Sequence, residues 1–388
     1  MRSRSFGSFR MAEHSAPPLV VAVLLHPDRT ADLDALGWDL LVRQARTSNL
    51  LARLANMLLG TPRLAASIPE RVRPHLESAL YIAIRQRQSS QWELTCIAAA
   101  LHSVSGQVVV LKGAAYVALE LPFAATRLFG DVDILAPSCD LAAVETALRI
   151  KGWAPGTISD YDQRYYRRWM HELPPMHHRR RGTTIDVHHT VLPKTARIKL
   201  NATVLFRGLL PLPAHPGLHV LPPATMVLHS ATHLFHEGEF SNGLRDLFDL
   251  DALLRHFGTE PEFWPALLDT ASAMGVGRPL SYALTLTHRM LGTPIPTEAL
   301  AAAMAYAPSA PISWLMDWLF QKALAPVHDS CATPSRRLAW FLLYLRSHWL
   351  RMPAPMLALH LARKAWRRWS GHEARDAERQ QRATDPAR

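Results

Sequence analysis

Cysteine is scarce in this chain of 388 residues, which contains only Cys96, Cys139 and Cys331. The three lie far apart, and no Cys-x-x-Cys spacing occurs among them. An odd, scattered set of this kind argues against a disulfide framework and against a zinc ribbon. It is typical of a reducing compartment, so we expect a cytoplasmic protein.

Long apolar runs are missing as well. The best candidate, PPLVVAVLLHP at residues 17–27, is shorter than the roughly 18 apolar residues that a membrane span requires. A basic stretch precedes it, yet no small-residue cleavage pattern follows, so we do not expect a signal peptide. The sequence has no internal repeat and no glycine or proline period, which excludes fibrous and low-complexity classes.

Acidic residues are too few to balance the basic ones, and the formal net charge is +11. The excess is uneven, because residues 331–388 contain twelve Lys and Arg against four Asp and Glu. Since the rest of the chain shows no aromatic-basic binding module, we do not expect nucleic acid as a partner. Two interpretations of the basic tail stay open. We favour a helix that packs on the body with its basic side in solvent over an amphipathic helix in weak contact with the inner face of the membrane.

The composition, 48% hydrophobic and 19% charged, is sufficient for a large core. Apolar residues at three- and four-residue spacing predict helices before residue 103 and after residue 222, whereas β-branched runs between them predict strands. We therefore predict an α+β fold, with a small mixed β-sheet core between helical N-terminal and C-terminal segments. The predicted units are a disordered N-terminus (1–18), a helical region (19–103), an α/β core (104–200), a helical domain (201–330) and a basic amphipathic tail (331–388). Helices are predicted after the core at 223–236, 241–256, 261–274, 278–291, 297–306 and 311–324.

Three carboxylates fall on the predicted strands of the core, which are QVVVLKG (107–113), GDVDILAP (130–137) and TTIDVHHTV (183–191). The period of two places Asp131 and Asp133 on one face of the second strand, and Asp186 lies in the third. Like charges this close on an apolar strand are unfavourable unless something neutralises them. A hard divalent cation such as Mg²⁺ does so, because it takes oxygen ligands and is completed by substrate phosphates.

A simpler interpretation of each residue stays open. Asp131 and Asp133 are also compatible with turn residues that open a strand, with Gly130 in the turn. Asp186 is compatible with a surface carboxylate, and Lys112 and Arg127 are each compatible with a solvated charge. The combined pattern favours a site, because Gly-Asp-x-Asp follows a strand that ends in Lys-Gly, and a third strand adds another Asp.

The motifs LKG, GDVDIL with an Arg before it, and IDVHH resemble the nucleotidyltransferase superfamily with the DNA polymerase beta-like fold. They are most similar to its uncharacterised bacterial nucleotidyltransferase family, over about residues 90–255. The resemblance implies that Asp131 and Asp133 bind two metal ions and that Asp186 completes the catalytic site. It also implies a nucleotide-binding set that steadies the triphosphate, made of Lys112, Gly113, Arg127 and Gly130. Ala114 departs from the Gly or Ser that the superfamily has after its first glycine.

The resemblance implies transfer of a nucleoside monophosphate from an NTP, such as ATP, to an acceptor, with release of pyrophosphate by a two-metal mechanism. The implied cofactors are two Mg²⁺ ions, for which Mn²⁺ is an alternative. The acceptor is open: a small molecule, a sugar, a peptide and a protein all fit. The alternative is a non-catalytic nucleotide-binding protein with a regulatory or partner-binding role, although the intact carboxylates argue against it.

Other polar residues have weaker claims. His188 lies on the face of the third carboxylate, where it either contacts substrate or packs. Residues 170–182, MHELPPMHHRRRG, are predicted as a hairpin whose arginines face phosphate or solvent. His229 and His233 have helical i, i+4 spacing, but without a third ligand we do not expect zinc. Asp246 either accepts the proton of an attacking hydroxyl or forms a surface ion pair.

Overall fold

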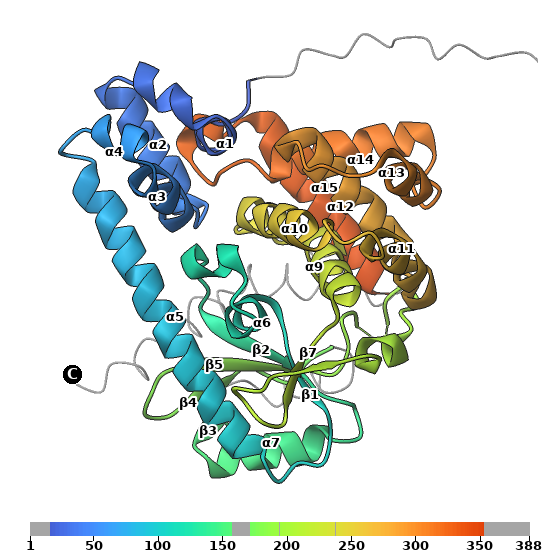
Figure 1. The fold of residues 1–388 in the computed structure, drawn as a ribbon. Coiled ribbons are helices and arrows are strands. Elements are labelled where there is room, and N and C mark those ends of the chain that lie inside the picture. Colours follow the sequence, from blue (N-terminus) through green and yellow to red (C-terminus); the bar gives the residue numbers. More distant parts are fainter. Residues whose placement is uncertain (1–15, 157–170, 194, 237, 353–388) are drawn as a thin grey trace, which may run out of the picture.

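The structure is a computed structural model that describes residues 16–156, 171–193, 195–236 and 238–352. In Figure 1 the β-sheet occupies the lower part of the molecule, and a small N-terminal group of helices and a larger C-terminal group lie above it. The disorder predicted for residues 1–18 falls almost entirely outside the described residues, and so does most of the predicted tail.

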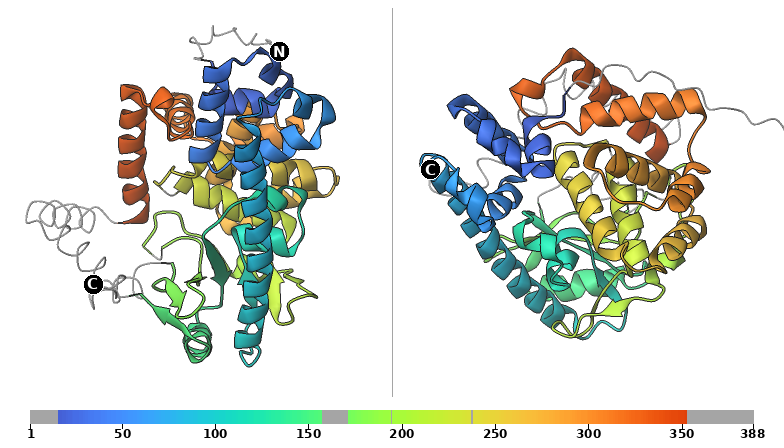
Figure 2. Two further views of the ribbon diagram at one scale, coloured as in Figure 1. Left: turned by 90° about the vertical axis from the view of Figure 1, so that its left-hand side faces the viewer. Right: turned by 45° about the horizontal axis from the view of Figure 1, so that its top comes forward.

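The N-terminal helices lead to the sheet through one long helix. They are α1 (Leu19–Leu25), η1 (Pro27–Asp32), α2 (Ala35–Thr47), α3 (Leu51–Gly60), α4 (Pro62–Ala66) and α5 (Arg73–Leu101). Pro62 and Pro74 lie in the first turns of α4 and α5, where a backbone N–H is not required. The long α5 contacts α3, α6 and α7 and runs along the outside of the molecule in both views of Figure 2. It therefore connects the N-terminal helices with the helices that cover the sheet.

The sheet contains, in the described residues, seven strands in the order β3-β4-β5-β2-β1-β7-β6. They are β1 (Val108–Val110), β2 (Asp131–Leu135), β3 (Trp153–Pro155), β4 (Met176–His178), β5 (Thr184–His188), β6 (Leu210–Pro211) and β7 (Leu218–Val220). β2 pairs in parallel with β5, and β1 in parallel with β7, whereas the other pairs are antiparallel. Between the strands lie α6 (Lys112–Ala118), η2 (Pro122–Thr126), α7 (Leu141–Ile150) and η3 (Ala202–Phe206). This mixed sheet among helices agrees with the predicted α+β class.

The predicted strands form the centre of the sheet, as β1, β2 and β5. The sequence analysis missed β3, β6 and β7, because each has only two or three residues, which is too short for a period-two pattern. Two of them also end on proline, at Pro155 and Pro211. β7 pairs with the second edge of β1, and the valines of β1 are fully buried.

The C-terminal helices follow the predicted ranges closely. They are α9 (Pro223–His236), α10 (Gly243–Phe257), α11 (Phe263–Met274), α12 (Gly277–Leu291), α13 (Thr297–Met304), α14 (Ala310–Ala323), η4 (Asp329–Cys331) and α15 (Pro334–Arg351). Gly275 and Gly292 end α11 and α12 in the left-handed conformation that glycine adopts most easily. Because glycine is common at helix ends, these two residues made the ends of α11 and α12 predictable from the sequence.

One continuous apolar core extends from α1 to α15 and includes both sides of the sheet. Within it α15 packs against α14 and buries Ala339 and Leu343. No helix in the described ranges is both long and apolar enough to cross a lipid bilayer. The membrane contact that was kept as the less favoured alternative for the basic tail concerns mainly residues 353–388, which lie outside the described residues.

Candidate active site

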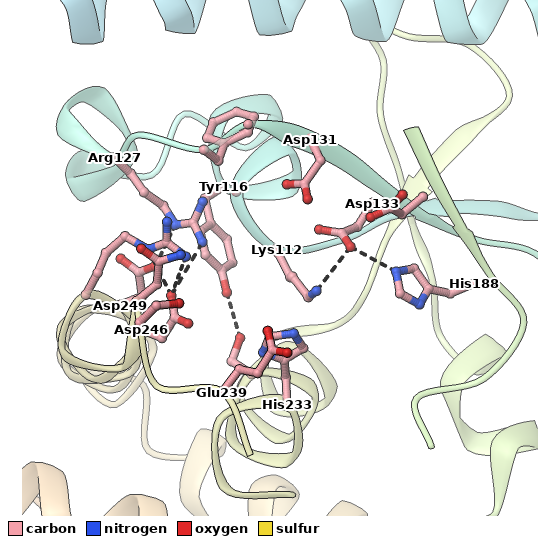
Figure 3. Close-up of a pocket in the computed structure, with 18 of the residues that line it drawn as sticks. Lys112, Tyr116, Arg127, Asp131, Asp133, His188, His233, Glu239, Asp246 and Asp249 are labelled. Atoms are coloured by element: carbon pink, nitrogen blue, oxygen red, sulfur yellow. Dashed lines mark hydrogen bonds and ion pairs between the residues drawn. The ribbon is translucent and has the colours of Figure 1, made fainter. Parts of the chain in front are cut away.

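Two neighbouring strands place three carboxylates side by side. β2 and β5 are parallel, and their register sets Asp133 directly beside Asp186. Asp131 begins β2 two residues earlier and therefore lies on the same face as Asp133 (Figure 3). The sheet thus brings together the three carboxylates that the sequence pattern singled out.

Lys112 follows β1 and reaches the same place. Its Nζ donates a hydrogen bond of 3.1 Å to Oδ1 of Asp133. The backbone of Lys112 has a φ of +45°, which is uncommon for a residue other than glycine. Strain of this kind concentrates at functional sites, where the surrounding structure enforces it. Here the backbone N–H of Leu111 donates to the carbonyl of Asp133, so pairing of the strands holds the lysine beside the carboxylate.

Asp133 is buried and doubly paired. Its Oδ1 also accepts a hydrogen bond of 2.9 Å from Nε2 of His188. Burial alone would raise the pKa of the Asp133 carboxyl, but the Lys112 cation and the His188 hydrogen bond hold this pKa well below its usual range. Asp133 is therefore ionised at neutral pH, and its charge has partners.

Asp186 is in the opposite situation. Its Oδ1 is buried and has no hydrogen-bond partner among the described residues. Burial, and then the charges of Asp133, Glu172 and Asp131, raise the pKa of Asp186 to about 7. The pKa of the more exposed Asp131 is also raised, by partial burial and by the charge of Asp133. The cluster thus has more negative charge than Lys112 and His188 compensate.

An excess of carboxylate oxygens with a buried, unsatisfied atom fits a hard divalent cation. Such an ion takes oxygen ligands and would lower the repulsion that raises the pKa of Asp186. The residues present therefore fit Mg²⁺, and Mn²⁺ accepts the same ligand set.

A cavity of about 540 Å³ opens onto these side chains (Figure 3). Seven residues that line it are the predicted site residues Lys112, Gly113, Arg127, Gly130, Asp131, Asp133 and Asp186. Small-molecule sites span roughly 300–1,000 Å³, so the cavity has the size expected for a ligand such as a nucleotide.

Arg127 lines the cavity, but its positive charge is already paired with a carboxylate of the protein. Its Nε donates to Oδ2 of Asp249 on α10 at 2.5 Å, and both side chains are buried. The guanidinium also lies over the rings of Tyr116 and Phe129, at 5.5 and 5.6 Å from their centroids. Its Nη1 is buried without a hydrogen-bond partner in the described residues. Arg127 is therefore first a link between the sheet and α10.

The two glycines of the predicted set differ in what they make room for. A Cβ on Gly113 would lie 2.1 Å from Nη1 of Arg127 and 2.9 Å from the ring of Phe129. A Cβ on Gly130 would have nothing within 4 Å. Gly113 is thus required by the packing of Arg127, whereas Gly130 leaves open space beside the carboxylates.

The wall opposite the sheet comes from the C-terminal helices. It includes His233 of α9, Glu239 and Asn242 of the following turn, Asp246 of α10 and Arg351 at the end of α15. Sequence reasoning missed Glu239 and Arg351, because neither belongs to a motif and only the fold brings them to the cavity. Asp246 was considered, and its Oδ1 accepts hydrogen bonds of 2.9 and 2.7 Å from Arg245.

Two further sequence hypotheses lead elsewhere. The hairpin predicted at 170–182 exists as β4 and β5, yet none of Arg179, Arg180 and Arg181 lines the cavity. Arg181 instead pairs with Glu93 of α5 at 2.8 Å. The histidines of α9, His229 and His233, belong to no three-ligand cluster in the part of the chain that the structure describes.

Residues 34–292 match the model of a family described as an uncharacterised nucleotidyltransferase. The chain belongs to this family. The matched part of the nucleotidyltransferase runs from the start of α2 to the end of α12, and it contains the described sheet and every residue named for the cavity except Arg351. No curated protein and no solved structure shows significant similarity to the chain. Membership of a nucleotidyltransferase family implies a nucleotide as the substrate.

Proposed function

We propose that this nucleotidyltransferase transfers a nucleoside monophosphate from an NTP to an acceptor and releases pyrophosphate, with the carboxylate arrangement of the polymerase beta-like superfamily. The register that sets Asp133 beside Asp186, with Asp131 on the same face, carries this proposal. It supplies a compact set of oxygens with an unbalanced negative charge, at the wall of a cavity of nucleotide size.

The carboxylates of Asp131, Asp133 and Asp186 would hold the Mg²⁺ ions, two of them by resemblance to the superfamily. Bound Mg²⁺ would neutralise triphosphate charge and stabilise the attacking and leaving oxygens. Lys112 would act on the same group: it already faces Asp133 and is a cation that pairs well with phosphate oxygens.

Asp186 is the group best suited to accept the proton of the acceptor. Its buried Oδ1 has no hydrogen-bond partner among the described residues, so this oxygen is open to a proton. The acceptor oxygen forms a bond to the α-phosphorus, the bond from that phosphorus to the bridging oxygen breaks, and pyrophosphate leaves with the electron pair. The proton of the acceptor passes to Oδ1 of Asp186.

A purely regulatory nucleotide-binding role is less well supported. Such a role requires no unsatisfied carboxylate, whereas the buried Oδ1 of Asp186 and the strained backbone of Lys112 are costly features. Both are explained if the site performs chemistry.

The test uses NTPs labelled either at the α- or at the γ-phosphorus, with Mg²⁺ and a filtered cell extract as the source of acceptors. We expect α-label in a new product and γ-label in pyrophosphate. Asp131→Asn with Asp133→Asn should abolish both, and Asp269→Asn, at an exposed carboxylate of α11, should not. Transfer of γ-label to product, or hydrolysis alone, would contradict the proposal.

A further inference from the structure

A second group of ligand atoms lies beside the carboxylates, on residues that the proposed transfer does not use. His171, Glu172 and His188 each offer one ligand atom, and these three atoms lie within 4.8 Å of one another. Oε2 of Glu172 is 3.3 Å from Nδ1 of His188 and 3.7 Å from Nε2 of His171. Both histidines are buried, and Glu172 is partly buried.

We propose that His171, Glu172 and His188 bind a divalent transition metal ion of the zinc class, at a site separate from the three aspartates. The distances suit such an ion. Ligand bonds of about 2.0–2.1 Å in a tetrahedron set the ligand atoms roughly 3.4 Å apart. The two separations that involve Glu172, 3.3 and 3.7 Å, lie near this value, and the two imidazole nitrogens lie within 4.8 Å of each other.

The ligand types select the ion. Two imidazoles and one carboxylate are the donors that Zn²⁺ and its neighbours in the first transition row prefer, whereas Mg²⁺ prefers oxygen alone. The three residues also line the cavity, so a fourth ligand position faces the space where substrate or water lies. Three protein ligands with an open fourth position are the usual form of a zinc site that acts on a substrate.

Asp133 fixes the orientation of one of the three ligands, His188, through a hydrogen bond. Nε2 of His188 bonds to Oδ1 of Asp133 at 2.9 Å, and this leaves Nδ1 directed at Glu172. A carboxylate that holds one imidazole nitrogen while the other ligates a metal is the common outer-shell arrangement of metal-binding histidines. The cluster is therefore connected with the carboxylate site through a single imidazole.

The backbone holds the ligands in place without any metal. Glu172 and His188 form an antiparallel bridge. The N–H of His189 donates to the carbonyl of His171 at 2.9 Å, and the N–H of Leu173 donates to the carbonyl of Val187 at 2.8 Å. The segment that carries His171 and Glu172 is thus paired with the end of β5, where His188 lies, so the three ligands are preorganised.

Binding of Zn²⁺ to these three residues does not depend on nucleotidyl transfer, so it can be measured without an NTP. Untagged full-length protein is stripped with a chelator and titrated with Zn²⁺ against a chromophoric competitor, in the presence of excess Mg²⁺. We expect one Zn²⁺ per chain. His171→Ala and Glu172→Gln should each weaken Zn²⁺ binding at least tenfold, whereas His177→Ala, at an exposed histidine of β4, should leave it within twofold.

Asp131→Asn separates this site from the aspartate site: Zn²⁺ affinity should stay within threefold of that of the wild type. Loss of Zn²⁺ in this variant, with retention in Glu172→Gln, would assign the ion to the aspartates and overturn the proposal. Wild-type protein that binds no Zn²⁺ would overturn it as well.

X-ray absorption of the Zn²⁺-loaded wild type gives an answer that does not depend on the variants. We expect scattering from two imidazoles and an oxygen ligand, and a first shell made of oxygen alone would contradict the assignment.

Discussion

Asp186 lies among like charges, and no described side chain satisfies its buried oxygen. Its pKa rises from 3.8 to about 7, so the ionised carboxylate opposes folding at neutral and alkaline pH. The penalty is complete above pH 7 and declines as the pH falls from 7 towards 4, because the folded protein then binds a proton that the unfolded chain does not. Without a bound metal ion, the ionised Asp186 therefore lowers the free energy of unfolding of the protein.

Asp186→Asn should therefore stabilise the metal-free protein at pH 8 by about 2 kcal/mol. The gain should disappear as the pH approaches 4, which urea unfolding at a series of pH values will show. Mg²⁺ should raise the melting temperature of the wild type at pH 8 but have little effect on the variant. Asp269→Asn, on the exposed side of α11, is the matched control with no expected gain. A variant less stable than the wild type at pH 8 would show that Asp186 is not under repulsion.

A substitution at Gly113 tests how tightly Arg127 and Phe129 pack against this position. Gly113→Ala would place a methyl group 2.1 Å from Nη1 of Arg127, and we expect a loss of about 1–3 kcal/mol in the free energy of unfolding. Gly130→Ala adds the same methyl group in open space, so its effect should stay within about 0.5 kcal/mol. Chemical denaturation of the two variants checks this, and equal effects would contradict the packing role of Gly113.

At the scale of elements, the ion pair of Arg127 and Asp249 joins the loop before β2 to α10. Both charges are buried, so each requires the other. This explains why an arginine that the resemblance assigned to phosphate is held against a helix of the opposite wall. Through it, the position of α10 is coupled to the strand that carries Asp131 and Asp133.

Asp249→Ala should lower the free energy of unfolding by about 3–5 kcal/mol, because it leaves a buried guanidinium without its counter-charge. Replacing both partners, with Arg127→Met and Asp249→Leu, should recover a large part of that loss. Asp246→Ala removes a more exposed carboxylate, which lies 3.9 Å from Arg127 and accepts two hydrogen bonds from Arg245, and it should cost less than Asp249→Ala. Urea unfolding compares the three, and a double variant no more stable than Asp249→Ala would contradict the pairing.

The elements differ in how far the sequence predicts them. The long amphipathic helices were readable because their periodicity spans several turns and because proline and glycine mark their ends, as at Pro223, Gly275 and Gly292. β3, β6 and β7 were not, since each has only two or three residues, and β3 and β7 pair with strands distant in the sequence. Asp131 and Asp133 were predicted from one short pattern, and Asp186 from a separate strand and the resemblance to the family.

At the scale of the whole molecule, the cavity is assembled from parts that are far apart in the chain. The sheet supplies the three aspartates, the start of α6 supplies Lys112, α9 and α10 supply the opposite wall, and α15 adds Arg351. The sequence predicted Lys112 and the three aspartates. It gave no sign of Glu239 and Arg351, because they reach the cavity only through the fold and belong to no local motif. Sequence reasoning also missed the pairing of His171 and Glu172 with the end of β5, although it singled out the histidine-rich segment in which they lie.

The metal and nucleotide site is tested most directly by the anomalous diffraction of crystals grown with Mn²⁺ and a non-hydrolysable NTP. We expect manganese bound by Asp131, Asp133 and Asp186, with the triphosphate oxygens completing its coordination and Lys112 within hydrogen-bond distance of a phosphate. Manganese and nucleotide bound elsewhere, with the three carboxylates free of both, would contradict it.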